Sequence, residues 1–155
     1  MMNTKTKKLS TVSMVLCGMF AALVAIGAFI QIPVPYMDYF TLQFFFVLLA
    51  GLILGADKGA ISVGCYVLLG LVGVPIFAAG GGIGYIFRPS FGYLVGFIVS
   101  AYVTGKVCEK LKASYKNYLL ACLAGFVVTY AIGIVYKFII LNFYAHTPAT
   151  LGVIF

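Results

Sequence analysis

The most constraining feature of this sequence is a series of long apolar stretches that carry almost no charge. A helix needs about 20 apolar residues to cross the roughly 30 Å hydrocarbon layer of a membrane. Stretches of about that size recur along the chain, and only 8% of its residues are charged, whereas a soluble domain carries about 25%. The sequence therefore predicts an all-α integral membrane protein, a polytopic helical bundle, and excludes a soluble fold.

Proline, glycine and charged residues divide the apolar stretches into five predicted spans within a single transmembrane domain, residues 1–155. Pro33 and Pro35 end the first span, because proline fixes its backbone angle and lacks an amide proton. The charged turn GADKG ends the second. The predicted spans cover about residues 12–32, 42–54, 60–74, 91–105 and 118–141, and a further segment begins at 147–155.

The net charge of +7 concerns topology rather than a nucleic-acid partner. No basic face with interleaved aromatic residues lies outside the apolar stretches, so nucleic-acid binding is not expected. Cytoplasmic loops of membrane proteins collect lysine and arginine. All lysines except Lys137 fall in three such groups: Lys5, Lys7 and Lys8; Lys58; and Lys106, Lys110, Lys112 and Lys116. This pattern predicts a multi-pass protein of the cell (inner or plasma) membrane with a cytoplasmic N-terminus.

The segment FAAGGGIGYIFRPSFGY is the most informative for function. Glycine costs about 1 kcal/mol relative to alanine inside a helix, so Gly80, Gly81 and Gly82 predict a break in the helix. Irregular backbone at membrane depth is tolerated only where protein or a water-filled cavity surrounds it. The glycines serve either close helix approach or a loop that lines a ligand, and the nearby Tyr85 and Tyr93 favour the ligand.

Arg88 is the single arginine of the chain and lies shortly after the glycines. Its planar guanidinium can clamp a carboxylate with two parallel hydrogen bonds. The alternative is that it extends from a helix end to lipid phosphates. We favour the ligand role, because charged residues that face the interior of a membrane bundle mark functional sites.

The first predicted span carries small residues at helical spacing, namely Gly18, Ala21, Ala22 and Ala25. Small residues let helices approach closely within a membrane. The face that they form either packs inside the bundle or docks a separate membrane subunit. Spacing alone leaves both uses open.

An enzyme is not expected, and neither is a cofactor or a metal site. Paired carboxylates are needed for intramembrane aspartyl chemistry, but the predicted topology places Asp38 outside and Asp57 inside. The cysteines lack the spacing of metal ligands, and no local signature pairs any of them with His146 for nucleophilic catalysis.

The combination of these segments resembles the BioY family, the biotin-specific S components (substrate-capture subunits) of energy-coupling factor transporters. A helix stopped by proline, a glycine loop and a helix start of the form P-S-x-G-Y carry most of the specificity. The resemblance covers essentially the whole chain, through the segments GMFAALVAIGA, VPYMDYFTLQ, LAGLILGADKGAISVGCYVLLGLVGVPIFAAGGGIGY and RPSFGYLVGF.

The resemblance implies a six-helix bundle that holds one biotin near its outer face and has no ATPase of its own. It implies partners in the bilayer and the cytoplasm, a transmembrane coupling subunit and two ATPase subunits. Docking on the coupling subunit would use Gly18, Ala21, Ala22 and Ala25. The implied ligand-binding residues are Gln43, Gly80, Gly81, Gly82, Tyr85, Arg88 and Tyr93, with Arg88 facing the valerate carboxylate of biotin.

Two departures from the family pattern are visible. Some members carry an arginine directly after the motif tyrosine, where this chain has Leu94. Members also end in a sixth helix that opens with P-G-D-x-x-K, whereas this chain ends at Phe155, so we expect the last helix to be lacking and the site to be incomplete. The alternatives to biotin capture are an S component for another small vitamin and a non-transporting membrane scaffold.

Overall fold

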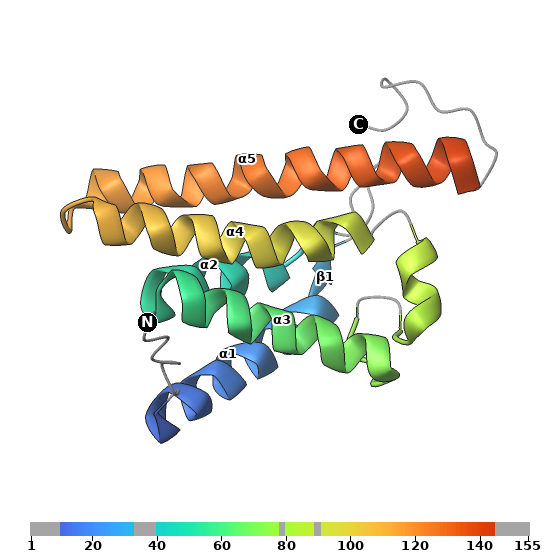
Figure 1. Cartoon of the computed structure of the whole chain (residues 1–155), viewed down its shortest axis with the longest axis horizontal. Helices are drawn as coiled ribbons and strands as arrows, with labels where there is room; N and C mark the ends of the chain where they lie inside the picture. Colours follow the sequence, from blue (N-terminus) through green and yellow to red (C-terminus); the bar gives the residue numbers. More distant parts are fainter. Residues whose placement is uncertain (1–9, 33–39, 78–79, 89–90, 145–155) are drawn as a thin grey trace, which may run out of the picture.

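The computed structural model describes residues 10–32, 40–77, 80–88 and 91–144, so the segment predicted at 147–155 lies outside the described residues. Within these ranges the chain forms five α-helices, a two-stranded ribbon, a short 3-10 helix and a final π-helical turn. Figure 1 shows α1, α2 and α3 gathered on one side of the long α4, with α5 on the other side.

Helix α1 (Thr11–Phe29) begins at Ser10, whose hydroxyl oxygen accepts a hydrogen bond from the Ser13 amide at 3.2 Å. After the helix the chain becomes extended and forms strand β1 (Gln31–Ile32), which pairs antiparallel with β2 (Phe40–Thr41). Gln31 pairs with Thr41 in this ribbon. The ribbon closes one end of the bundle and leads directly into α2.

Helices α2 (Gln43–Leu54) and α3 (Ala56–Val72) are separated by Gly55 alone. Gly55 has a φ of 88°, a conformation that residues with a side chain rarely adopt, so it permits this abrupt turn. Glu109 caps the start of α3, because its Oε1 accepts from the Ala56 amide at 3.1 Å. A carboxylate at a helix N-terminus is favoured by the unpaired amides there.

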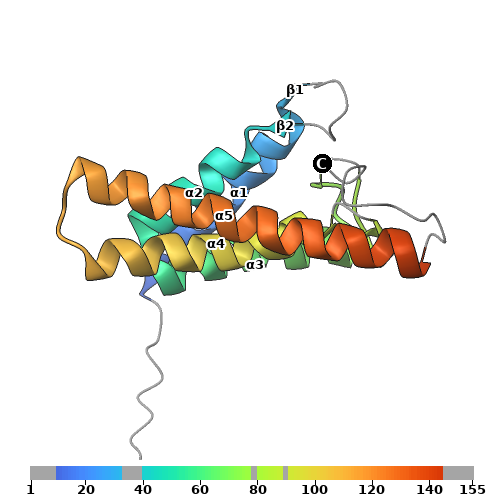
Figure 2. The same ribbon diagram turned by 90° about the horizontal axis from the view of Figure 1, so that it is seen from above.

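Helix α4 (Phe91–Lys110) and helix α5 (Tyr115–Ile139) form a long antiparallel hairpin, and the π-helical turn (Ile140–Tyr144) follows. Figures 1 and 2 both show the connection between α4 and α5 projecting beyond the ends of the other helices. The facing positions are small or hydroxylated residues four apart, at 92, 96, 100 and 104 of α4 and at 121, 125, 129 and 133 of α5. Ser100 Oγ donates to the Gly125 carbonyl oxygen at 3.0 Å and Thr104 Oγ1 donates to that of Ala121 at 3.4 Å.

Among the residues that the structure describes, three helices are long and apolar enough to cross a membrane: α1, α4 and the continuous helix of residues 115–143. The helices overlap the five predicted spans but differ in their bounds. The first helix stops at Phe29 because residues 31–32 join the ribbon, and the third begins at Ala56 because Glu109 caps it. Helix α4 continues to Lys110 because lysine and glutamate favour a helix, and their charges require only that this last part of the helix lies outside the lipid.

Candidate functional site

The glycine segment folds back on the end of α3 and is fixed there by Phe77. The Phe77 ring fills a notch at Gly70, where an added Cβ would lie 2.2 Å from two ring carbons, and only 1% of Phe77 is exposed. The Gly82 amide donates to the Gly70 carbonyl oxygen at 2.6 Å. Gly80 and Gly82 have φ values of 116° and 99°, which require glycine. The predicted break in the helix is therefore a loop with a defined path.

Aromatic side chains continue from this notch toward Arg88. The Tyr66 hydroxyl, on α3, donates to the Ile76 carbonyl oxygen at 2.8 Å, and its ring lies 5.6 Å from that of Phe77. The Phe77 ring lies 4.6 Å from the ring of Tyr85, on the 3-10 helix η1 (Ile83–Phe87). The Arg88 guanidinium lies 5.5 Å from the centre of the Tyr85 ring, a cation–π distance. Arg88 is exposed, so its charge is open to a ligand.

Gln43 is the first residue of α2 and is almost completely buried, with 3% exposed. Its Nε2 has no hydrogen-bond partner among the described residues, although the side chain lies near the Tyr66 hydroxyl. An amide group buried without a partner costs about 1–3 kcal/mol. Gly27 of α1 lets the helices meet here, because a Cβ at that position would lie 2.8 Å from the Gln43 backbone. The amide is thus held where α1 and α2 meet, beside the Tyr66 hydroxyl.

Tyr93 lies on α4 at the interface with α5 rather than in the aromatic row. A Cβ at Gly133 would lie 2.4 Å from its ring, and the Tyr130 ring is 5.9 Å away. A second tyrosine of α5, Tyr136, donates its hydroxyl hydrogen bond to the Ile86 carbonyl oxygen in η1. Helix α5 therefore holds η1 in place through Tyr136, and Tyr93 of α4 packs against α5.

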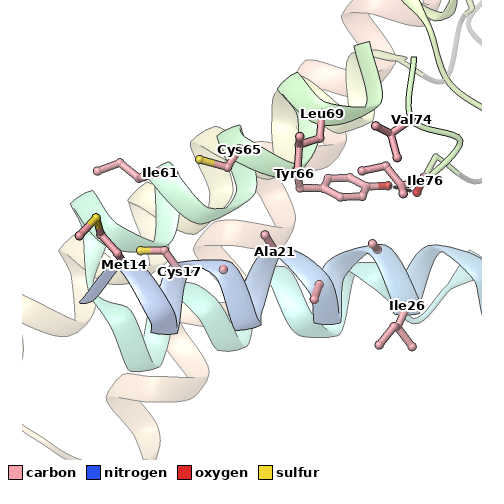
Figure 3. Close-up of a pocket in the computed structure, with 13 residues that line it drawn as sticks. Met14, Cys17, Ala21, Ile26, Ile61, Cys65, Tyr66, Leu69, Val74 and Ile76 are labelled. Carbon is pink, nitrogen blue, oxygen red and sulfur yellow. Dashed lines mark hydrogen bonds between the residues drawn. The ribbon is translucent and has the colours of Figure 1, made fainter. Parts of the chain in front are cut away.

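An apolar groove runs between α1 and α3, with a volume of about 670 Å³. Figure 3 shows side chains from both helices and from the segment after α3 around it. Beside the groove, Ser62 Oγ of α3 donates a hydrogen bond of 2.7 Å to the Cys17 carbonyl oxygen of α1, which ties the two helices together. All four residues predicted to dock a partner line this groove: Gly18, Ala21, Ala22 and Ala25.

The structure thus gathers most of the predicted site residues at one end of the bundle. Tyr85, Arg88 and the glycines form one group, and Gln43 joins it through Tyr66. Sequence reasoning missed Tyr66, Phe77 and Tyr136, which fix the loop. Tyrosines inside apolar spans were the available signal for two of these, because buried hydroxyls need partners. In the part of the chain that is described, no three His, Cys, Asp or Glu side chains gather as a metal site.

Comparisons with known proteins agree with this arrangement. A family model described as "BioY family" matches residues 2–155. The protein named "Probable biotin transporter BioY" from Lysinibacillus sphaericus is 41% identical over 150 residues, which are 96% of this chain and 76% of that protein. The "Biotin transporter BioY" of Thermotoga maritima is 45% identical over 130 residues, 83% of this chain and 73% of that protein.

A solved structure shares the fold. It is a crystal structure of the S-component for biotin from an ECF-type ABC transporter, and it matches with a TM-score of 0.78 at 24% sequence identity. The match covers 92% of this chain and 77% of the other chain. The helical arrangement described above is therefore that of a known membrane transporter subunit.

Proposed function

The chain belongs to the BioY family, and from that premise we propose that it is the biotin-binding S component of an energy-coupling factor transporter. In this role it captures biotin at the outer face of the membrane, and partner subunits drive the import with ATP. The observation that carries the proposal is the family match over residues 2–155, together with relatives named as biotin transporters. These relatives are transporter subunits and not enzymes.

The geometry supports particular roles for the site residues. The fused ureido ring of biotin needs a few well-placed hydrogen bonds, and its tail needs an apolar wall. Gln43 offers a donor for the ureido carbonyl, because its buried Nε2 has no hydrogen-bond partner among the described residues. The loop of Gly80, Gly81 and Gly82 allows close approach, and Tyr85 offers an aromatic wall beside it, while Tyr93 would contribute from the α4–α5 interface. Arg88, exposed and held over Tyr85, pairs with the carboxylate of the tail.

The groove between α1 and α3 is the proposed docking face for the transmembrane coupling subunit, which links the protein to two cytoplasmic ATPases. Gly18 and Ala22 are exposed, and a Cβ added at Gly18 would meet nothing within 4 Å. Ala21 is 8% exposed and forms the floor of the groove. A partner helix can approach closely over such a surface, because small side chains leave room for its own.

We propose that the N-terminus is cytoplasmic. Lys58 lies in the first turn of α3, whose start is joined to Glu109 near the end of α4. It therefore lies at the same end of the bundle as the lysines around the α4–α5 turn: Lys106, Lys110, Lys112 and Lys116. The test introduces cysteine at Ala113, after the native cysteines have been replaced by alanine. A maleimide that cannot cross the membrane should label the new cysteine only after the cells are permeabilised. Labelling in intact cells would show that the turn is outside and would contradict the proposed orientation.

Calorimetric titration of vitamins into the purified protein tests the function. We expect biotin to bind, while riboflavin, thiamine and folate do not, because their ring systems differ in size and in hydrogen-bonding pattern. Tight binding of another vitamin in place of biotin would favour an S component of different specificity. Binding of none would favour the scaffold alternative, in which the glycine loop is purely structural.

A further inference from the structure

The turn between α4 and α5 is an ordered structure at the far end of the bundle from the aromatic row. Asn117 Nδ2 donates to the Lys112 carbonyl oxygen at 2.7 Å, and the Ser114 carbonyl oxygen accepts from the amides of Asn117 and Tyr118. The turn projects past the neighbouring helices in both views (Figures 1 and 2). Its side chains are therefore presented to the surroundings on a fixed frame.

This turn carries a positive charge that the described part of the protein does not neutralise. Its single acid is Glu109, which is used internally: one carboxylate oxygen caps α3 at Ala56, and the other lies 3.9 Å from Lys106 Nζ. Lys110, Lys112 and Lys116 are exposed and form no ion pair with any residue that the structure describes. Three lysines within seven residues thus remain available to an anion.

Two tyrosines accompany these lysines. Tyr115 is 86% exposed and Tyr118 is 43% exposed, at the very start of α5. Exposed tyrosines at the end of a membrane helix are typical of the interface between lipid and water, because the ring is apolar and the hydroxyl is polar. Tyrosines in this position would set the depth of the turn at that interface, with the three lysines level with the lipid headgroups.

We propose that the α4–α5 turn is a binding site for anionic phospholipid, in which Lys110, Lys112 and Lys116 contact the headgroup and Tyr115 and Tyr118 contact the glycerol and upper acyl region. Basic clusters beside a membrane helix attract anionic lipid by about 1 kcal/mol for each lysine near the surface. A fixed turn gives this attraction a defined place, since the lysine backbones are already ordered. The site is independent of the biotin site at the opposite end.

The chain contains no tryptophan, so a single tryptophan at position 115 reports on this site alone. The Tyr115→Trp protein is placed in nanodiscs of neutral phosphatidylcholine with a small share of brominated lipid, which quenches nearby tryptophan. We expect brominated phosphatidylglycerol to quench with an apparent binding constant at least about fivefold above that of brominated phosphatidylcholine, the factor expected from one lysine. The preference should shrink at high salt, because screening shortens the reach of exposed charges.

Two triple variants in the Tyr115→Trp background provide the matched comparison. Lys110→Gln, Lys112→Gln and Lys116→Gln should abolish the preference, while Lys5→Gln, Lys7→Gln and Lys8→Gln should leave it unchanged despite the same loss of net charge. Equal quenching by both lipids in the Tyr115→Trp protein without further changes would overturn the proposal. Equal loss of the lipid preference in the two triple variants would overturn it as well. Soluble glycerol phosphate at millimolar concentration should not restore fluorescence; if it does, the turn is a site for free phosphate esters instead.

Discussion

The α4–α5 interface and the α1–α3 groove are both lined with small residues, yet one is closed and the other is open. In the interface, a Cβ at Gly125 would lie 2.4 Å from Thr104 Oγ1, and one at Gly96 would lie 3.0 Å from the Thr129 carbonyl oxygen. In the groove, a Cβ at Gly18 would meet nothing within 4 Å. The same sequence pattern therefore serves an intramolecular contact in one place and leaves an unfilled surface in the other.

The difference shows what a stripe of small residues can indicate. Where the partner helix is joined by a short turn, as α5 is to α4, the small residues are covered by that helix, and hydrogen bonds from hydroxyl groups cross the contact. Where the stripe remains uncovered, the close approach that it permits is available to another membrane protein.

Gly96→Leu should have the largest effect, a loss of the folded bundle. The added side chain meets the backbone of Thr129, which cannot move aside, and overpacking of this kind costs about 1–3 kcal/mol or more. The loss of stability is measured by thermal unfolding in detergent, followed with a dye that reacts with newly exposed cysteines. Gly64→Leu is the control, because a Cβ there meets nothing within 4 Å. Equal melting temperatures for the two variants would contradict the closed interface.

The double change of Gly18 and Ala22 to leucine should leave the fold and biotin binding intact but prevent docking. Both positions line the open groove, so the added side chains occupy the space reserved for a partner helix. The coupling subunit recovered with a tagged protein should fall about tenfold or more, as expected for overpacking of an interface. Undiminished recovery would show that the partner docks elsewhere.

Gly70→Ala should weaken biotin binding about tenfold and also destabilise the fold, because overpacking by one methyl group costs about 1–3 kcal/mol and here displaces a ring that is only 1% exposed. The new methyl group would lie 2.2 Å from the Phe77 ring and expel it from its notch. Equilibrium binding of labelled biotin measures the change. Adding Phe77→Leu, a smaller side chain, should recover part of the affinity. An unchanged affinity in Gly70→Ala would mean that the notch does not position the ligand loop.

The smallest expected effect lies in the hydroxyls of the closed interface. Thr129 Oγ1 is buried without a hydrogen-bond partner among the described residues, so Thr129→Val should stabilise the bundle by about 1 kcal/mol. Thr104→Val should destabilise it by a similar amount, because its hydroxyl donates to the Ala121 carbonyl oxygen. Opposite shifts in melting temperature are expected, and shifts of the same sign would contradict this assignment.

The membrane fold could be predicted from hydropathy alone, because uncharged stretches of span length have few other uses. The bounds of the helices could not. Residues 31–32 continue the uncharged stretch of the helix before them, but they pair with residues 40–41 and so form a strand instead. Likewise, the charged end of α4 continues as helix although it lies beyond the predicted span.

The site was predictable in its local features and not in its long-range ones. Glycines at 80 and 82 indicate irregular backbone wherever they lie, and the positive φ values agree with this. The fit of Phe77 into Gly70 depends on how the chain returns after Pro75, which spacing does not reveal. The buried amide of Gln43 was named through resemblance, whereas its lack of a partner is visible only in three dimensions.

The most direct test of the central claim is a calorimetric titration of biotin and biotin amide into the protein and its Arg88→Ala variant. If the site holds biotin with Arg88 on the carboxylate, the protein should bind biotin, and the variant should lose about tenfold or more of its affinity for biotin while binding the uncharged amide nearly as before. Arg88→Lys should recover only part of the loss, because a point charge cannot reproduce the planar fork. No binding of biotin by the unsubstituted protein would contradict the account, and equal weakening of both ligands would remove Arg88 from the carboxylate.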